Sequence, residues 1–159
     1  MSESAPKEEH ELWFQAAGKV AEKALCLRAK CGTVIVKDDK IIGEGYNGPP
    51  LDDIQQSRCH DEFIPGKTKY DKTCCLHAEW RAIMNAIKRH PQEIAGSDLY
   101  FTRVDDHGVL LKSGAPFCTV CSRLALDAGV ARFFLWHNDG IVGYPTLEYN
   151  NLSYLYRPE

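Results

Sequence analysis

The segment Cys74-Cys75-Leu76-His77-Ala78-Glu79-Trp80-Arg81-Ala82-Ile83 (residues 74–83) opens a stretch with helical periodicity. Apolar residues recur along it at helical spacing: Trp80, Ile83, Met84 and Ile87. His77 and Glu79 are two residues apart at the start of this stretch, so both side chains can project from the first turn of one helix. The segment therefore predicts a helix that presents an imidazole and a carboxylate at its N-terminus.

A second segment, Pro116-Phe117-Cys118-Thr119-Val120-Cys121, supplies two thiols. Cys118 and Cys121 are three residues apart, which places both sulfurs on one face of a helix. One imidazole and two thiolates are ligands that zinc prefers, and a zinc ion with three protein ligands keeps its fourth position for water. A carboxylate beside that water can take a proton from it and return the proton to a leaving group. The two segments therefore predict a catalytic zinc site with the ligands His77, Cys118 and Cys121 and with Glu79 as the proton shuttle.

Two other interpretations use the same kinds of residue. A Cys-x-x-Cys pair can be a redox pair, and a structural zinc would take a fourth ligand from Cys59, Cys74 or Cys75. The two halves of the motif nevertheless occur in the order His-x-Glu and then Cys-x-x-Cys, each at a predicted helix start. This order is typical of zinc-dependent nucleobase deaminases, and the joint match favours the catalytic interpretation.

The composition is that of a compact globular protein. With 159 residues, of which 44% are hydrophobic, we expect one domain over residues 1–159, with the polar residues 1–9 flexible. The net charge of -3 gives no basic footprint, which argues against a nucleic-acid substrate and favours a small molecule.

The number of cysteines indicates the redox state of the compartment in which the protein resides. Seven cysteines, an odd number, without an apolar signal segment at the N-terminus indicate a reducing compartment in which thiols stay free or bind metal. We therefore expect a cytoplasmic protein that is largely free of disulfides. No apolar run approaches the length needed to cross a bilayer, so no membrane partner is expected.

Helical and strand patterns alternate along the chain, which indicates an α/β protein. Residues 11–27 and a stretch from His77 to about Arg89 predict helices, and Cys118 opens a third helix that Gly129 would cap. The expected strands are residues 31–37 and 40–46 as a hairpin, 98–104, a possible return strand at 109–111, and 130–136. The strand–helix–strand order at the end favours parallel pairing of residues 98–104 with 130–136.

Two loops are candidates for ligand contacts. Residues 45–50, Gly-Tyr-Asn-Gly-Pro-Pro, predict a rigid loop in which Asn47 either contacts a ligand or simply forms a turn. Residues 51–73 form a long polar segment that suits a substrate lid or phosphate contacts, or else a solvated loop. Its basic residues include Arg58, His60, Lys67 and Lys69.

From about Arg28 to Trp136 the sequence resembles the deoxycytidylate (dCMP) deaminase branch of the zinc-dependent cytidine deaminase-like superfamily. The resemblance rests on Arg28 with residues 32–36, on the loop 45–50, on His77-Ala78-Glu79 with Ala82-Ile83, and on Cys118-x-x-Cys121. It implies a three-layer α/β/α fold, in which helices flank a mixed sheet of about five strands. It also implies a homo-oligomer, because sites in this family often lie near subunit contacts.

The resemblance further implies zinc-dependent hydrolysis of dCMP, or a close cytosine nucleotide, to dUMP and ammonia. Zinc would be held by His77, Cys118 and Cys121, and water activated there would attack C4 of the ring. Glu79 would protonate N3. Asn47 would contact the sugar, and the backbone N–H of Ala78 would hold the pyrimidine carbonyl.

The chain departs from the family pattern at two positions that we expect near the pocket. Phe117 stands between Pro116 and Cys118, and Arg81 occupies a position where relatives often have asparagine. Some relatives carry a second, structural zinc. Here Cys59, His60 and Cys74 or Cys75 are candidate ligands for one, and free thiols are the alternative.

Two other functions are compatible with these motifs. One is a deaminase of the same fold that acts on another amino-heterocycle, such as a nucleoside, a free base or a base in nucleic acid. The other is a zinc domain without catalysis. The C-terminal tyrosines are expected either to pack ordinarily or to lie over a neighbouring site or a subunit interface: Tyr144, Tyr149, Tyr154 and Tyr156.

Overall fold

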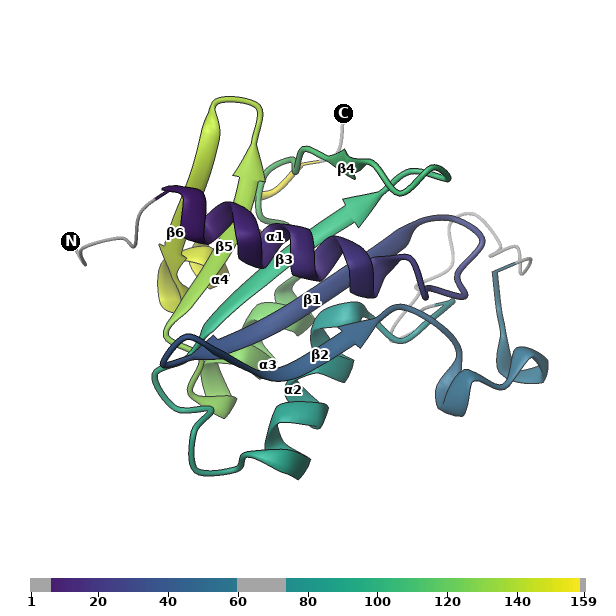
Figure 1. The fold of residues 1–159 in the computed structure, drawn as a ribbon, viewed down its shortest axis with the longest axis horizontal. Coiled ribbons are helices and arrows are strands. Elements are labelled where there is room, and N and C mark those ends of the chain that lie inside the picture. Colours follow the sequence, from purple (N-terminus) through teal and green to yellow (C-terminus); the bar gives the residue numbers. More distant parts are fainter. Residues whose placement is uncertain (1–6, 60–73, 158–159) are drawn as a thin grey trace.

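A mixed β-sheet forms the middle layer of the protein in a computed structural model, which describes residues 7–59 and 74–157 (Figure 1). Its strands are β1 (Lys30–Lys37), β2 (Lys40–Tyr46), β3 (Asp98–Val104), β4 (Leu110–Leu111), β5 (Arg132–His137) and β6 (Gly140–Pro145). The helices are α1 (Lys7–Ala21), α2 (Ala78–Arg89), α3 (Thr119–Ala128) and α4 (Thr146–Leu155). Two short 3-10 turns, Pro50–Asp52 and Ile54–Gln56, follow β2.

The sheet confirms the predicted mixed topology and adds a strand. The strand order is β2-β1-β3-β5-β6, with β4 pairing with β3, so the described sheet has six strands. β3 and β5 pair in parallel, as the strand–helix–strand order predicts, and the other neighbours are antiparallel. Arg132 donates two hydrogen bonds to the Asp98 carboxylate, at 2.9 and 2.8 Å, and so joins the first residues of the two parallel strands.

Alternation along the strands divides the core into two halves, one on each face of the sheet. Val34 and Val36 of β1 pack with Phe14 and Ala17 of α1, whereas Ile35 packs with α2, α3 and α4 residues on the other face. Figure 1 shows α1 crossing one face of the sheet while α2 and α3 lie against the other. The three-layer α/β/α fold expected from the resemblance is therefore present.

Two glycines of β2 let α2 approach the sheet closely. A β-carbon at Gly45 would lie 2.5 Å from the carbonyl oxygen of Ala78 and 2.5 Å from the nitrogen of Ala82. A β-carbon at Gly43 would meet the carbonyl oxygen of Ala82 at 2.5 Å. Because these neighbours are helix backbone, they cannot move aside without shifting α2, and α2 carries the His-x-Glu motif at its start.

Replacing Gly45 with alanine should therefore both destabilise the fold and displace α2. We expect an overpacking cost of about 2 kcal/mol or more, which lowers Tm by roughly 4–8 °C in a chain of this size. Gly114→Ala is the matched control, since nothing lies within 4 Å of a β-carbon there. Thermal unfolding followed by circular dichroism measures both variants, and equal Tm values would contradict the close approach of α2.

The first helix differs from its predicted bounds at both ends. Residues 7–9, which we expected to be flexible, form its first turn, where Glu8 and Glu9 are stabilised by the helix dipole. The helix ends at Ala21, because Leu25 donates its N–H to the carbonyl oxygen of Asn47, 3.1 Å away, which draws the following segment toward β2. The remaining residues expected to be flexible, 1–6, lie outside the described residues.

Two elements were not predicted from the sequence, and some apolar side chains of the predicted helices are exposed. β6 and α4 were not predicted, since two glycines and a proline weaken the strand signal and the apolar residues of α4 do not gather on one face. Met84 and Ile87, part of the apolar pattern that predicts α2, are exposed, as is Leu124 of α3. No helix in residues 7–59 or 74–157 combines the length and the apolar character needed to cross a bilayer.

Candidate active site

The N-termini of α2 and α3 meet at the predicted metal site. His77 is the N-cap of α2, and Cys118 is the N-cap of α3, with Cys121 in the first turn of that helix. Nδ1 of His77 lies 3.2 Å from Sγ of Cys121 and 3.5 Å from Sγ of Cys118. The parallel pairing of β3 and β5 places α3 beside α2, so residues about 40 positions apart in the sequence converge at one point.

The three groups form a donor set that suits one metal ion. Their ligand atoms all lie within 4.8 Å of one another, and both cysteines are buried. The Sγ atoms of Cys118 and Cys121 are in contact, close enough to pair as a disulfide. A disulfide does not require an imidazole nitrogen at hydrogen-bond distance from both sulfurs. A metal ion does require that its ligand atoms converge in this way. The donor set therefore fits a zinc ion with an open fourth position.

The environment of His77 favours the metal-binding form of its ring. Burial lowers the pKa of the imidazole, so the neutral ring predominates at neutral pH. The ring stacks on Trp80, with centroids 4.1 Å apart and planes within 4° of parallel. Trp80 thus fixes the orientation of the imidazole and keeps Nδ1 directed toward the two sulfurs.

Glu79 is a buried carboxylate, with 5% of its surface exposed. Burial raises its pKa to about 7, while its own backbone N–H acts in the opposite direction. A bound cation would lower this pKa again. A carboxyl group with a pKa near neutrality can be ionised in one step of a reaction and protonated in the next.

A cavity of about 620 Å³ lies in front of these groups. Four of the predicted site residues line it, namely Asn47, His77, Ala78 and Glu79. Ala78 is the first residue of α2, so its N–H has no partner within the helix and can bind a ligand oxygen. The cavity is large enough for a nucleotide-sized molecule.

The side chain of Asn47 is already engaged in holding the cavity wall together. Its Oδ1 accepts a hydrogen bond from the backbone N–H of Cys31, and its Nδ2 donates to the carbonyl oxygen of Ala29, each at 2.8 Å. The amide therefore joins the end of β2 to the segment that enters β1. A ligand could use only its remaining N–H or lone pair, so the turn and ligand interpretations of Asn47 are compatible.

Several cavity residues were not predicted as site residues from the sequence. Arg103 reaches the cavity from β3, and Tyr149 reaches it from α4. Tyr149 is buried and stacks on Phe133, with centroids 3.9 Å apart. Phe117, which was expected near the pocket, lines the cavity together with Tyr156, and their ring centroids are 5.5 Å apart. Of the four C-terminal tyrosines, Tyr149 and Tyr156 therefore line the cavity, which favours the interpretation that these two lie over a site, whereas Tyr144 and Tyr154 do not line it.

Arg81 points away from the cavity, contrary to expectation. It donates hydrogen bonds to the carbonyl oxygens of Tyr46 and Pro49 and to the Asp52 carboxylate, the last at 2.8 Å. Its side chain therefore clamps the loop after β2 onto α2.

The long segment predicted to provide a lid or phosphate contacts is described only through Cys59. Of its basic residues, Arg58 is not among the residues that line the cavity, and its N–H donates to the carbonyl oxygen of Cys74 at 3.4 Å. His60, Lys67 and Lys69 lie outside the described residues. The prediction for this segment therefore stays a prediction.

Solved structures with the same architecture come from deaminases. A cytidine deaminase from Burkholderia pseudomallei superposes with a TM-score of 0.56 at 17% identity, covering 88% of this chain and 94% of that one, which shows a shared fold. A dCMP deaminase from the cyanophage S-TIM5, in complex with dCMP and dUMP, superposes with a TM-score of 0.56 at 27% identity and 82% coverage of each chain.

The chain belongs to the cytidine and deoxycytidylate deaminase family, whose zinc-binding region matches residues 7–136. It is 30% identical over 129 residues to the deoxycytidylate deaminase of Mycobacterium phage D29, which covers 77% of this chain and 89% of that protein. The match with the fission yeast deoxycytidylate deaminase spans only 34% of that longer protein. These likenesses confirm the predicted family and its reaction class, hydrolytic deamination.

Proposed function

We propose that the protein converts dCMP to dUMP with release of ammonia. The observation that carries the proposal is the convergence of His77, Cys118 and Cys121 beside the buried carboxyl of Glu79, at the wall of a nucleotide-sized cavity. The phage relative is a deoxycytidylate deaminase, and the cyanophage structure contains dCMP and dUMP, which supports this substrate.

The three ligand residues each have a part in this reaction. Zinc held by His77, Cys118 and Cys121 would supply a Lewis acid that makes water nucleophilic near neutral pH. The two cysteines lie at the start of α3, where partial positive charge stabilises thiolates. The stacked, neutral ring of His77 keeps its lone pair directed at the same point.

Glu79 transfers protons between water and the substrate in this proposal. Its carboxylate takes one proton from the attacking water and delivers it to N3 of cytosine as the C4–O bond forms. It then moves the second proton of that water to the amino group, and the C4–N bond breaks to release ammonia. One water is consumed, and its oxygen becomes O4 of uracil. A pKa near 7 lets the same carboxyl accept and donate.

A backbone N–H positions the pyrimidine in this proposal, and a side-chain amide positions the sugar. The free N–H of Ala78 at the start of α2 donates to the ring carbonyl. The amide of Asn47, which is fixed by its bonds to Ala29 and Cys31, contacts the sugar with its remaining hydrogen-bonding capacity. Because Ala78 begins a helix and the amide of Asn47 is held by two hydrogen bonds, the two groups would orient C4 toward the metal ligands.

The phosphate would be bound by the cationic side chains that line the cavity. Arg28 and Arg103 are the lysine or arginine residues that line it within residues 7–59 and 74–157. Two guanidinium groups in the cavity lining match the charge of a nucleoside monophosphate, which a nucleoside lacks. This arrangement favours a nucleotide substrate over deoxycytidine.

We expect Arg103→Gln to raise KM for dCMP by about tenfold, because a hydrogen bond to a charged group contributes roughly 1.5–3 kcal/mol. KM for deoxycytidine, which has no phosphate, should change little. Arg89→Gln, a substitution in the last turn of α2 outside the cavity lining, serves as the control. Steady-state kinetics measure KM for both substrates. An equal rise in both KM values would contradict a phosphate contact.

The hydrolytic reaction is tested by running it in water enriched in oxygen-18. Mass spectrometry of the product should find dUMP that carries one heavy oxygen per molecule, because O4 comes from the solvent. Formation of a product other than dUMP, or of dUMP without the heavy oxygen, would overturn the proposed reaction.

The proposal also includes the cellular compartment and the oligomeric state of the protein. A reducing, cytoplasmic compartment would keep Cys118 and Cys121 as the free thiolates that a metal requires. A homo-oligomer is expected from the family, and light scattering of the purified protein measures its mass directly.

A further inference from the structure

The loop that carries Asn47 is attached to α2 on both sides of the His-x-Glu motif. This loop, the Asn47 loop, comprises residues 46–52, from the end of β2 through the first 3-10 turn. Before the motif, the N–H of Leu76 donates to the carbonyl oxygen of Gly48 at 2.8 Å, and the N–H of Gly48 donates to the carbonyl oxygen of Leu76 at 3.3 Å. After the motif, the side chain of Arg81 reaches back to the loop. The Asn47 loop therefore has one attachment at each flank of the motif.

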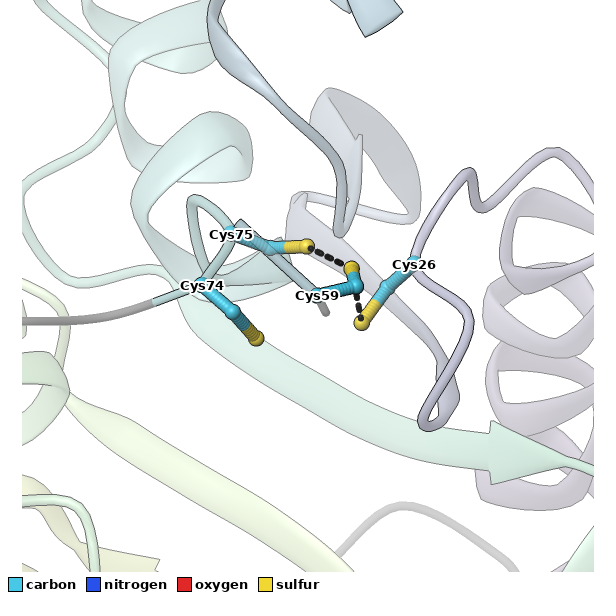
Figure 2. Close-up of side chains that lie close together, drawn as sticks. All are labelled: Cys26, Cys59, Cys74 and Cys75. Carbon is cyan, nitrogen blue, oxygen red and sulfur yellow. Dashed lines mark hydrogen bonds between the residues drawn. The ribbon is translucent and has the colours of Figure 1, made fainter. Parts of the chain in front are cut away.

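The attachment before the motif directly follows two of four cysteines that converge on one point: Cys26, Cys59, Cys74 and Cys75 (Figure 2). Their sulfur atoms all lie within 4.8 Å of one another, and Sγ of Cys59 is 3.7 Å from Sγ of Cys26 and 3.5 Å from Sγ of Cys75. This donor set fits the structural zinc that some relatives carry, with Cys26 in place of His60, which lies outside the described residues. The attachment before the motif is therefore supported by parts of the chain other than α2.

The attachment after the motif is made by one guanidinium group. Nη1 of Arg81 donates to the carbonyl oxygen of Tyr46 at 3.4 Å and to the Asp52 carboxylate at 2.8 Å, and Nη2 donates to the carbonyl oxygen of Pro49. The side chain of Arg81 is only 14% exposed, and its guanidinium lies 5.1 Å from the ring centroid of Tyr46. The planar fork of an arginine can bind several acceptors at once, which the single ammonium of a lysine does not reproduce.

The backbone of the Asn47 loop requires contacts that hold it in place. Leu51 and Asp52 have φ angles of 56° and 58°, in the left-handed region that residues other than glycine rarely adopt. Leu51 is 98% exposed, so its side chain does not anchor the turn by packing. The hydroxyl of Tyr46 donates to the Asp52 carboxylate, and this bond and Arg81 lower the pKa of that carboxyl. The conformation of the turn therefore depends on the contacts of Asp52.

We propose that Arg81 is a positioning residue, which sets the place of the Asn47 loop relative to the start of α2. The inference rests on the proposed function, in which Asn47 contacts the sugar while Ala78 and Glu79 contact the base. Sugar and base belong to one molecule, so the distance between the two sets of contacts has to match the substrate. Arg81 binds the carbonyl oxygen of Tyr46, the residue directly before Asn47, and thereby ties the sugar contact to the helix that holds the base.

The ionic part of this attachment is a feature of this chain. Arg81 stands where relatives often have asparagine, and an asparagine has no charge with which to pair with Asp52. The pair joins α2 to the turn at the far end of the Asn47 loop, with the two side-chain atoms 2.8 Å apart. Arg81 therefore adds a constraint to a loop that the Gly48 bridge holds on one side only.

A positioning role and a purely stabilising role predict different kinetics. A substitution that only destabilises the fold lowers the fraction of active enzyme, and with it the apparent kcat. A displaced sugar contact instead weakens binding of the ground state and the transition state alike, which raises KM and leaves kcat per active chain unchanged.

Arg81→Met tests the proposal, because methionine suits a helix but has neither the charge nor the donors. We expect KM for dCMP to rise by about tenfold, with kcat per zinc-loaded chain little changed. Asp52→Asn should also raise KM, and combining it with Arg81→Met should add little, since both remove the same contact. Arg81→Lys should recover part of the loss by pairing with Asp52. Arg89→Met, at an exposed position in the last turn of α2, is the matched control and should leave KM unchanged.

Hydrogen–deuterium exchange measures the Asn47 loop without the reaction. In the unchanged protein the N–H groups of Gly48 and Asp52 donate to the carbonyl oxygens of Leu76 and Pro49. Both groups should exchange faster in Arg81→Met than in the unchanged protein, while the N–H groups within α2 keep their protection.

An unchanged KM for dCMP in Arg81→Met would overturn the proposal, as would a fall in kcat alone that follows the loss of thermal stability. Unchanged exchange of the Asn47 loop would overturn it as well. If Arg81→Met does not fold, Asp52→Asn decides the same question, because the Asp52 side chain is 41% exposed. Failure of the unchanged protein to release ammonia from dCMP would refute the proposed function, and the exchange of the loop would still decide whether Arg81 holds it.

Discussion

Replacing Glu79 with glutamine is expected to lower kcat for dCMP by about 10³- to 10⁴-fold while leaving the zinc content unchanged. Glutamine has nearly the same size as glutamate, so it fills the buried position without leaving a void. Its amide can neither take a proton from water nor deliver one to N3. The variant should therefore keep its fold and its metal and lose the proton transfers.

Kinetics and metal analysis on the same preparation measure this prediction. Glu44→Gln is the control, since Glu44 is exposed on β2 and its side chain does not line the cavity. Unchanged kcat in Glu79→Gln would refute its role as the proton shuttle. Loss of zinc from this variant would mean that Glu79 is a ligand, which contradicts the three-ligand site.

Replacing His77 with alanine should remove one zinc ion per chain and lower turnover of dCMP by more than about 10⁴-fold, because both the Lewis acid and its position are lost. Two cysteines alone do not complete a site that needs three protein ligands. The imidazole is the group that α2 contributes to the pair of sulfurs on α3.

His107→Ala is the matched control, because His107 is exposed in the turn between β3 and β4 and belongs neither to the donor set nor to the cavity lining. It should keep the zinc content and the activity of the unchanged protein. Full zinc content in His77→Ala would contradict the ligand set. Full activity after measured zinc loss would contradict the need for metal.

The parts of the site that lie close together in sequence could be predicted from local patterns. His77 and Glu79 share one helix start, and Cys118 and Cys121 share another, so spacing alone places each pair. The parallel strands β3 and β5 followed from the strand–helix–strand order, which brings the two helix starts together. Chemistry that depends on short spacing and on a common topological rule is therefore visible in the sequence.

The remaining cavity residues depend on contacts that no local pattern encodes. Arg103 lies on a strand whose alternation indicates only which side chains are exposed, and Tyr149 lies on α4, a helix without an apolar face. Arg81 was expected near the cavity because it stands two residues after Glu79, where relatives often have asparagine, but its guanidinium bonds to carbonyl and carboxylate oxygens at the end of β2 and in the loop that follows. Tertiary packing decides these positions, and the convergence of Cys26 with Cys59 has the same origin.

The most direct test of the proposed activity is ammonia release from cytosine, cytidine, deoxycytidine, CMP, dCMP, adenosine and guanine, using protein of known zinc content. We expect turnover of dCMP, with much weaker turnover of deoxycytidine, because the two arginines that line the cavity would bind the phosphate. Turnover of another compound in the panel, without turnover of dCMP, would contradict the proposed substrate. No ammonia from any of them, with zinc bound at His77, Cys118 and Cys121, would contradict catalysis at this site.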